Sequence, residues 1–320
     1  MPVKLYLGEA VGLILKTMPF IWIRLGTYAL LGLGLAIYFA VAGGVAWLLG
    51  QALSFLGLLV FIVAIAGAWV LVQWAKRYFF YLLQAAHIAV MTEHIVYGQG
   101  PQGSQIQYGR QQVQARFKDT TLMFGVDQLI DGVVKQINRT FAQLTQILPI
   151  PDLDNFNQLI AQVSKFATTY IDEAILSRAY QYREQNVWSV AEDGVILYAQ
   201  SWKPVLANAV ALTILNYLEM IVVLVVLGIP AILLGAIIPI AAVRTLLGVL
   251  VLVGVWMFKL AISDAYAMAV TLLAYHRSTE GMEPNPDWKE RLTGVSEEFR
   301  KLCDRAKSAV SGQDTSSEEI

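Results

Sequence analysis

The chain has 320 residues, of which 57% are hydrophobic and only 15% are charged, and its formal net charge is −1. About 25% of the residues of ordinary soluble domains are charged, so the composition excludes that class, and the near-neutral charge excludes a basic nucleic-acid-binding surface. Cys303 is the only cysteine, which excludes an internal disulfide and a thiolate metal cluster. Because Cys303 lies in a charged segment, we expect its thiol to be exposed.

The N-terminal segment predicts a helix that lies on the membrane surface. Its apolar residues recur at helical spacing: Val3, Leu7, Val11, Ile14 and Met18. Glu9 and Lys16 interrupt the apolar run, which argues against a cleaved signal peptide. We therefore expect the segment to be retained, with Pro19 turning the chain into the membrane.

Residues 20–75 form an almost uncharged apolar block. A transmembrane helix needs about 20 residues to cross about 30 Å of hydrocarbon, so the block is long enough for two crossings. We expect these crossings over residues 20–41 and 53–75. Glycines gather between Gly43 and Gln51, so we expect the turn there.

Residues 204–258 form a second block of the same texture. Here we expect crossings over residues 205–227 and 245–260. An apolar turn framed by Gly228 and Pro239 is expected to join them, since glycine and proline disfavour a continuous helix.

Interfacial residues flank both blocks. Trp74 is followed by Lys76 and Arg77, and the second block is preceded by Trp202 and Lys203. Tryptophan favours the membrane interface and basic residues favour the cytoplasmic side, so these five residues are predicted to be interface anchors. This orientation places both termini in the cytoplasm.

Each block continues as a helical pattern beyond its second crossing. After the first block the pattern covers residues 78–97, and after the second it reaches residue 277. Gly98 to Pro101 and Gly281 to Pro284 end the two extensions, because glycine caps a helix and proline cannot continue it. The first extension is nearly long enough to be a third crossing, which is the alternative interpretation.

Amphipathic helices are predicted outside the membrane over residues 119–148, 152–170 and 287–310. In the first, apolar residues step by three or four: Leu122, Val126, Leu129, Val133, Ile137, Phe141, Leu144 and Leu148. The first two helices suggest a helical hairpin that packs on itself, on the membrane surface or on a partner.

The two halves of the chain share one order of parts, which suggests an internal duplication. The matching pairs lie about 182 to 185 residues apart: Pro19 and Pro204, Trp74 and Trp256, Gly98 and Gly281, and Phe117 and Phe299. Two crossings in each half keep the copies in one orientation, whereas three would invert them, as in many transporters.

The predicted fold is an all-α integral membrane protein. It consists of two tandem helical-hairpin repeats, with four transmembrane helices, and a cytoplasmic amphipathic helical insert. The expected divisions are residues 1–103 (first membrane repeat), 104–189 (cytoplasmic helical region), 190–286 (second membrane repeat) and 287–320 (cytoplasmic helix and disordered tail).

Glu219 is the strongest single functional candidate, with Asn216 one turn before it. Because a charge inside the bilayer is costly, an ionisable residue there is a functional candidate by default. The candidate partners of Glu219 are Arg24, Arg244 and Lys259. A structural polar contact is the alternative role.

Other polar residues point to less specific chemistry. His87 and His94 are seven residues apart on one helix, about 10 Å, which is too far for one metal ion to bridge. Asp264, five residues after Lys259, suggests a polar interface near the cytoplasm. The chain lacks a phosphate-binding glycine loop and a nucleophile elbow, so we expect no enzyme activity, no metal and no cofactor.

The leading functional hypothesis is a non-enzymatic scaffold, assembly factor or accessory subunit in the bacterial plasma membrane. Its partners would be the lipid bilayer and either a second copy or another protein, bound through the helices of residues 119–170, and no nucleic acid. The alternatives are a transporter or channel that uses Glu219, and lipid handling at the cytoplasmic leaflet by the surface helices.

Overall fold

The computed structural model describes residues 4–75, 79–117, 120–146 and 170–317, and these residues form helices and connecting turns with no strand among them. Four helices in these ranges are long and apolar enough to span a membrane. They are α2 (Met18–Ala52), α3 (Ser54–Ala75), α10 (Trp202–Ile237) and a continuous helix that includes α11 (Ala241–Phe258).

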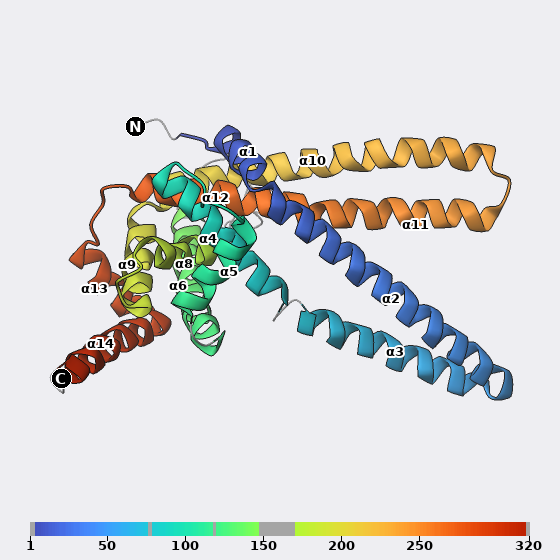
Figure 1. The fold of residues 1–320 in the computed structure, drawn as a ribbon, viewed down its shortest axis with the longest axis horizontal. Helices are drawn as coiled ribbons and strands as arrows, with labels where there is room; N and C mark the ends of the chain where they lie inside the picture. Colours follow the sequence, from blue (N-terminus) through green and yellow to red (C-terminus); the bar gives the residue numbers. More distant parts are fainter. Residues whose placement is uncertain (1–3, 76–78, 118–119, 147–169, 318–320) are drawn as a thin grey trace.

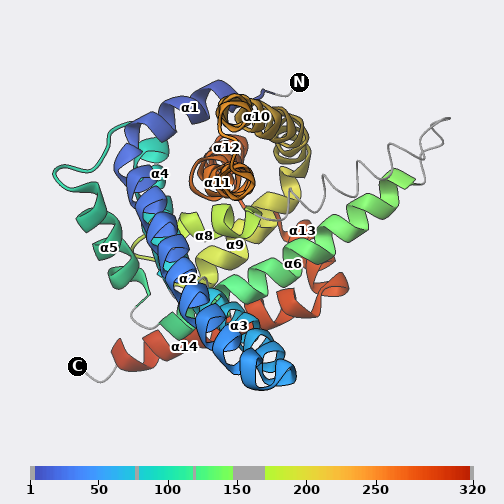
Figure 2. The same ribbon diagram turned by 90° about the vertical axis from the view of Figure 1, so that its right-hand side faces the viewer.

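The spanning helices leave a helical body as two separate arms (Figure 1). In the first arm, residues 18–75, α2 packs along α3; in the second arm, residues 214–258, α10 packs along α11. The arms approach each other at their bases and diverge toward their tips (Figures 1 and 2). At the base, α2 contacts the π-helix η2 (Lys259–Ser263), which continues α11 into the body.

The first arm turns later than the glycine pattern predicts, so the turn predicted between Gly43 and Gln51 was wrong. The second arm turns over residues 238–240, so its turn includes Pro239, as predicted, but not Gly228. α2 continues through Gly43 and Gly50 to Ala52, and α10 continues through Gly228 and Pro230 to Ile237. In an apolar environment an α-helix satisfies nearly every backbone N–H and C=O group internally. That gain outweighs the weak helix propensity of these residues.

The two longest helices are also partly embedded in the body. α2 has 35 residues and α10 has 36, which makes each more than about 50 Å long. The hydrocarbon core is only about 30 Å thick. The surplus lies in protein: Phe20 and Ile21 of α2 and Val205 to Thr213 of α10 are buried or half-buried among other helices.

The body gathers helices from all four predicted divisions of the chain around α8 (Ile171–Gln181). α8 contacts α4 (Tyr81–Tyr97), α6 (Thr120–Gln146), α9 (Val187–Gln200) and α12 (Asp264–Thr279). α5 (Gln105–Arg116), α13 (Pro286–Val295) and α14 (Glu297–Ser317) complete the body. The largest fully buried side chains include Met91, Ile175, Met268 and Phe299, one from each division, and all four belong to one core.

The N-terminal helix α1 (Leu7–Lys16) packs on protein instead of lying free on a membrane surface. Ala10, Leu13 and Ile14 are buried, whereas Val11, predicted to lie on the same apolar face, is 49% exposed. α1 contacts α12. The side chain of Asn208 in α10 accepts a hydrogen bond from the backbone N–H of Tyr6 at 2.8 Å, which fixes the start of the chain to the second arm.

The structure of the body also bears on three predicted helices, over residues 78–97, 119–148 and 152–170. α4 is buried from Ala85 to Thr92 and is not among the candidate spanning helices, so the third-crossing alternative finds no support. α6 coincides with the helix predicted over 119–148 and buries Val126, Ile130 and Val133 against the body. The helix predicted over 152–170 lies almost entirely outside the described residues.

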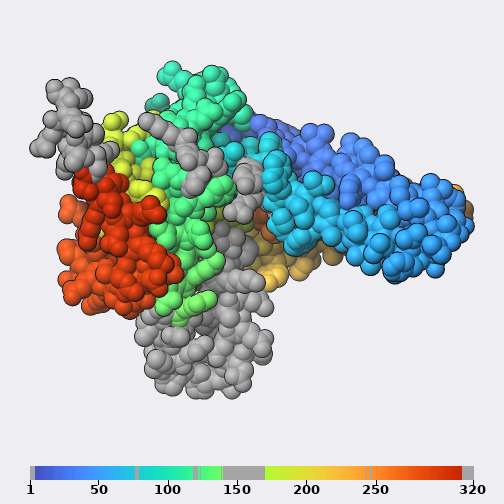
Figure 3. All heavy atoms as spheres, turned by 90° about the horizontal axis from the view of Figure 1, so that it is seen from below, coloured from blue at the N-terminus to red at the C-terminus, as the bar shows by residue number. Residues whose placement is uncertain are grey.

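The prediction of an exposed Cys303 was wrong, because α14 buries it. α14 packs against α6 and α9, and Figure 3 shows it beside α6 on the face seen from below. Phe299, Leu302, Cys303 and Ala306 form the buried face of α14. A segment rich in charge can therefore still carry a buried stripe, because only one side of a helix faces the core.

The tip of the first arm depends on glycine. A β-carbon at Gly57 would lie 2.5 Å from the Ala46 carbonyl oxygen and 3.0 Å from the Gly50 Cα, so α2 and α3 could not stay this close. We expect Gly57→Val to destabilise the arm by about 1–3 kcal/mol, measured as a lower Tm in detergent. Gly43→Val, where the space is open, is the matched control. Equal losses at the two positions would contradict the close packing.

Candidate functional site

A polar cavity of about 320 Å³ lies where the two arms join the body, and we call it the root cavity. Its lining comes from α2, the start of α4, α8 and its preceding residue, η2 and α12. The lining residues are Arg24, Tyr28, Phe80, Leu83, Gln84, Tyr170, Glu173, Lys259, Leu260 and Asp264. Residues from four separate stretches of the chain therefore meet at the point where the spanning helices enter the body.

Exposed tryptophans mark the level of this cavity along the arms. Trp22 is 65% exposed two residues before Arg24, and Trp256 is 52% exposed three residues before Lys259. Trp47, near the tip of the first arm, is 65% exposed about 37 Å further along α2 at about 1.5 Å per residue. Tryptophans favour both membrane interfaces, and this separation fits one bilayer. Trp22 and Trp256 therefore lie at the level of the root cavity along the arms.

Most of the polar groups in the cavity have partners. Lys259 Nζ lies 2.9 Å from Asp264 Oδ1, and the Tyr170 hydroxyl donates a hydrogen bond to the same oxygen at 2.9 Å. Gln84 Nε2 donates to Glu173 Oε1 at 2.7 Å. Asp264 is thus matched by a cation and a hydroxyl, and these contacts link the second arm to α8.

Two lining residues are exceptions, Arg24 and Glu173, each of which has one shielded side-chain atom without a hydrogen-bond partner among the described residues. In Arg24, a residue that is 6% exposed, this atom is Nη2. The guanidinium is stabilised by the charges of four neighbouring side chains: Tyr28, Asp264, Tyr170 and Glu173. A buried guanidinium that lacks a full set of partners is costly, because its lost hydration is not replaced.

A group of carboxyls lies behind the cavity on α6 and α8. Burial, together with the charge of nearby Asp172, raises the pKa of Asp127 to about 7. Burial likewise raises the pKa of Glu173 to about 7, and burial with the neighbouring Glu173 charge raises the pKa of Asp172. Asp172 Oδ1 and Glu173 Oε2 are shielded from solvent without a hydrogen-bond partner among the described residues. This group therefore holds protons near neutral pH.

The structure places Glu219 at the base of the second arm. Its carboxyl lies near Ser263 and Asp264, which adjoin the root cavity. The predicted third crossing over residues 205–227 placed Glu219 well inside the membrane. Residues 205–213 lie in the body, however. The part of α10 outside the body therefore begins only a few residues before Glu219. Asn216, one turn earlier, is half-buried.

None of the three candidate partners of Glu219 forms an ion pair with it within the described part of the chain. Arg244 lies near the arm tip, where its Nε atom donates to the Ile238 carbonyl at 2.9 Å. Lys259 pairs with Asp264, and Arg24 lines the root cavity. Sequence reasoning found Arg24, Lys259 and Asp264 separately but could not bring them together with Tyr170 and Glu173.

The predicted interface anchors divide into three groups. Trp74 is 64% exposed near the end of α3. Lys76 and Arg77 lie outside the described residues. Trp202 and Lys203 begin α10 at its body end, where Lys203 Nζ lies 5.7 Å from the Trp202 ring centroid. They are about 25 Å along the helix from Glu219, at a different level from Trp22 and Trp256.

His87 serves a packing contact, whereas both ring nitrogens of His94 are shielded without a hydrogen-bond partner among the described residues. His87 is fully buried, its ring stacks on Phe20 with centroids 4.7 Å apart, and its Nε2 atom lies 2.9 Å from the Thr17 hydroxyl. Burial holds the pKa of His87 well below its usual range, so the ring stays neutral. Among the described residues, no group of three or more His, Cys, Asp or Glu side chains is arranged to hold a metal ion.

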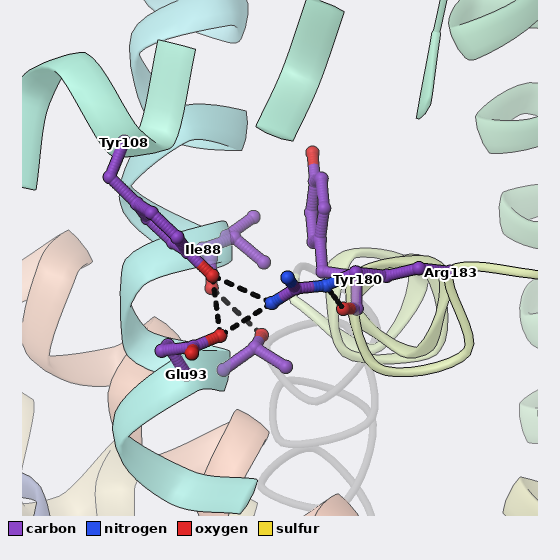
Figure 4. Close-up of polar contacts among 6 residues, drawn as sticks. Ile88, Glu93, Tyr108, Tyr180 and Arg183 are labelled. Atoms are coloured by element: carbon purple, nitrogen blue, oxygen red, sulfur yellow. Dashed lines mark hydrogen bonds and ion pairs between the residues drawn. The ribbon is translucent and has the colours of Figure 1, made fainter. Parts of the chain in front are cut away.

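A second polar network joins α4, α5 and the end of α8 (Figure 4). Arg183 Nη2 lies 2.6 Å from Glu93 Oε2 and 2.7 Å from the Tyr108 hydroxyl, which itself donates to Glu93. Arg183 Nε donates to the Tyr180 carbonyl at 2.9 Å. Glu93, Tyr108 and Arg183 all have partners in the protein, so this network fixes helices, while the Tyr180 hydroxyl is shielded without a partner among the described residues.

No protein-family model, curated protein or solved structure matches this chain. The function is therefore argued from the geometry of the arms and the root cavity.

Proposed function

We propose that the protein is a non-enzymatic membrane scaffold, acting as an assembly factor or accessory subunit. The two arms would span the bacterial plasma membrane, and the helical body, with both termini, would lie in the cytoplasm. The observation that carries this proposal is the separation of the arms: two pairs of apolar helices leave one body and diverge toward their tips (Figure 1). Such a frame anchors a body at two points on the membrane.

The position of charge along the arms supports an anchoring role over transport. A transport pathway needs polar groups near the middle of the bilayer. The charged residues of the two apolar blocks are Arg24, Glu219 and Arg244. Arg24 and Glu219 lie at the arm bases, and Arg244 lies near the tip of the second arm. The middle of each arm therefore offers no acidic or basic side chain to couple to a substrate.

We also propose that the two halves are duplicated copies. α2, α3 and α4 follow one another as α10, α11 and α12 do. Gly98 and Gly281, at the ends of the two extensions, have φ angles of 72° and 71°. A π-helical turn containing Phe79 and Phe80 precedes α4, and η2 precedes α12. Matching breaks at matching places support a common origin beyond shared hydrophobicity.

A partner would be expected to meet the outward side of α6, within the proposed 119–170 partner region. The inward side of α6 is covered by α8, α9 and α14, whereas Lys135 and Arg139 are exposed. Chemical cross-linking of the full chain in native membranes should trap a partner whose yield falls severalfold when Lys135 and Arg139 are both replaced by Glu. Lys301→Glu, an exposed lysine on α14, is the control and should leave the yield unchanged.

A transport assay provides the opposing outcome. For the purified protein in liposomes, we expect no solute or proton flux that depends on Glu219, so wild type and Glu219→Gln should behave alike. Flux that depends on Glu219 would overturn the scaffold proposal and favour the transporter alternative.

A further inference from the structure

The root cavity contains a buried arginine with an unpartnered guanidinium nitrogen. Two cations line it, Arg24 and Lys259, together with two carboxyls, Asp264 and Glu173. Lys259 and the Tyr170 hydroxyl already occupy Asp264, and Gln84 binds Glu173. Arg24 retains a shielded Nη2 atom without a hydrogen-bond partner among the described residues. Arg24 is 6% exposed, so its unpartnered nitrogen belongs to a buried residue, and the other unpartnered atom of the lining is an acceptor, Glu173 Oε2.

We propose that the root cavity binds the phosphate group of an anionic membrane lipid, with Arg24 as its main donor. A guanidinium presents several N–H groups in a planar fork that matches phosphate oxygens and often binds two of them at once. A phosphate on Nη2 would satisfy the unpartnered nitrogen and neutralise the charge. Burial leaves Glu173 partly protonated near neutral pH, so this carboxyl compensates Arg24 only in part.

The level of the cavity favours a lipid as the source of the phosphate. Trp22 and Trp256 place Arg24 and Lys259 at the membrane interface, where lipid phosphates lie. Basic pockets between membrane helices at this level bind anionic headgroups. A lipid already held in the bilayer also reaches such a site at high local concentration.

The walls of the cavity also suit an amphiphilic ligand. Phe80, Leu83 and Leu260 supply apolar surface beside the polar groups. Phe80 stacks on Tyr28 with ring centroids 4.5 Å apart, which joins α4 to the first arm along one wall.

Both π-helical segments contribute to the lining, through Phe80 on one side and through Lys259 and Leu260 on the other. π-helical turns are rare and are often found at functional sites. A bound lipid would therefore contact both arms at their junction with the body and hold the angle between them.

Native mass spectrometry of the full chain, with a thermal-shift assay, tests the proposal. The probes are phosphatidylglycerol, phosphatidylcholine and inorganic phosphate. We expect phosphatidylglycerol to remain bound and to raise Tm more than phosphatidylcholine does. Arg24→Gln should weaken phosphatidylglycerol binding about tenfold or more. Arg24→Lys should weaken it less, because the charge remains but the fork is lost.

Arg244→Gln is the matched control, since Arg244 lies near the far end of the second arm. Its affinity for phosphatidylglycerol should equal that of the wild type. Equal binding of phosphatidylglycerol and phosphatidylcholine by the wild type would overturn the proposal without any variant, so the test survives if Arg24→Gln fails to fold. Stabilisation by inorganic phosphate with none by phosphatidylglycerol would overturn the assignment to a lipid.

Discussion

Replacing Phe299 with Ala is expected to destabilise the body by about 3–5 kcal/mol, the usual cost of removing a buried phenyl ring. Phe299 is fully buried, and it lies with Leu302 and Ala306 on the face of α14 that packs against α6 and α9. Because α14 is the last helix of the body and part of it is exposed, its release does not require the rest of the core to unfold. We therefore expect α14 to detach first.

The single cysteine of the chain reports this detachment directly. Cys303 is 5% exposed, and burial raises the pKa of its thiol to about 11, with a smaller contribution from Glu192. Thiol-reactive reagents need an accessible thiolate, so the wild type should react slowly. Phe299→Ala should label many times faster under the same conditions.

Val310→Ala serves as the matched control, because Val310 is 48% exposed on the same helix. Its labelling rate should match that of the wild type. Its free energy of unfolding should stay within about 0.5 kcal/mol of the wild-type value. Rapid labelling of the wild-type protein, equal to that of Phe299→Ala, would show that α14 is not docked as the structure describes.

The buried carboxyls should make the protein less stable as pH rises from 5 to 8. The folded-state pKa of Asp127 is about 7, above its ordinary value of 3.8, because burial and Asp172 disfavour the charged form. For an acid shifted upward, the stabilising contribution is complete below the unfolded pKa and is lost as pH rises through the folded pKa. With Glu173 shifted in the same direction, the loss should reach about 2–4 kcal/mol.

Asp127→Asn should remove much of this dependence. The amide keeps the shape of the carboxyl but cannot ionise, so Tm should rise at pH 8 and change little at pH 5. Thermal unfolding at the two pH values measures the effect, with Asp304→Asn, an exposed residue of α14, as the control. A lower Tm for Asp127→Asn at pH 8 would mean that the ionised carboxylate stabilises the fold, contrary to our assignment.

The root cavity shows why the candidate site could be predicted only in part. A charge such as Arg24 or Lys259 stands out in an apolar block, and its cost in a membrane identifies it from sequence alone. Asp264, Tyr170 and Glu173 look like ordinary polar residues of a helical region. They join the site because α8 and α12 pack beside the base of α2, across distances of more than a hundred residues in the chain.

The sequence by itself determined that the chain is helical and has four segments able to cross a membrane, because long apolar runs leave the backbone no other way to satisfy its hydrogen bonds. Only the tertiary structure decided where those segments leave the body. Residues 205–213 were predicted to lie in the membrane but pack on protein, which places Glu219 at the arm base. Cys303 was predicted to be exposed but is buried. Apolar surface is covered equally well by lipid and by protein, so composition cannot distinguish the two environments, whereas packing does.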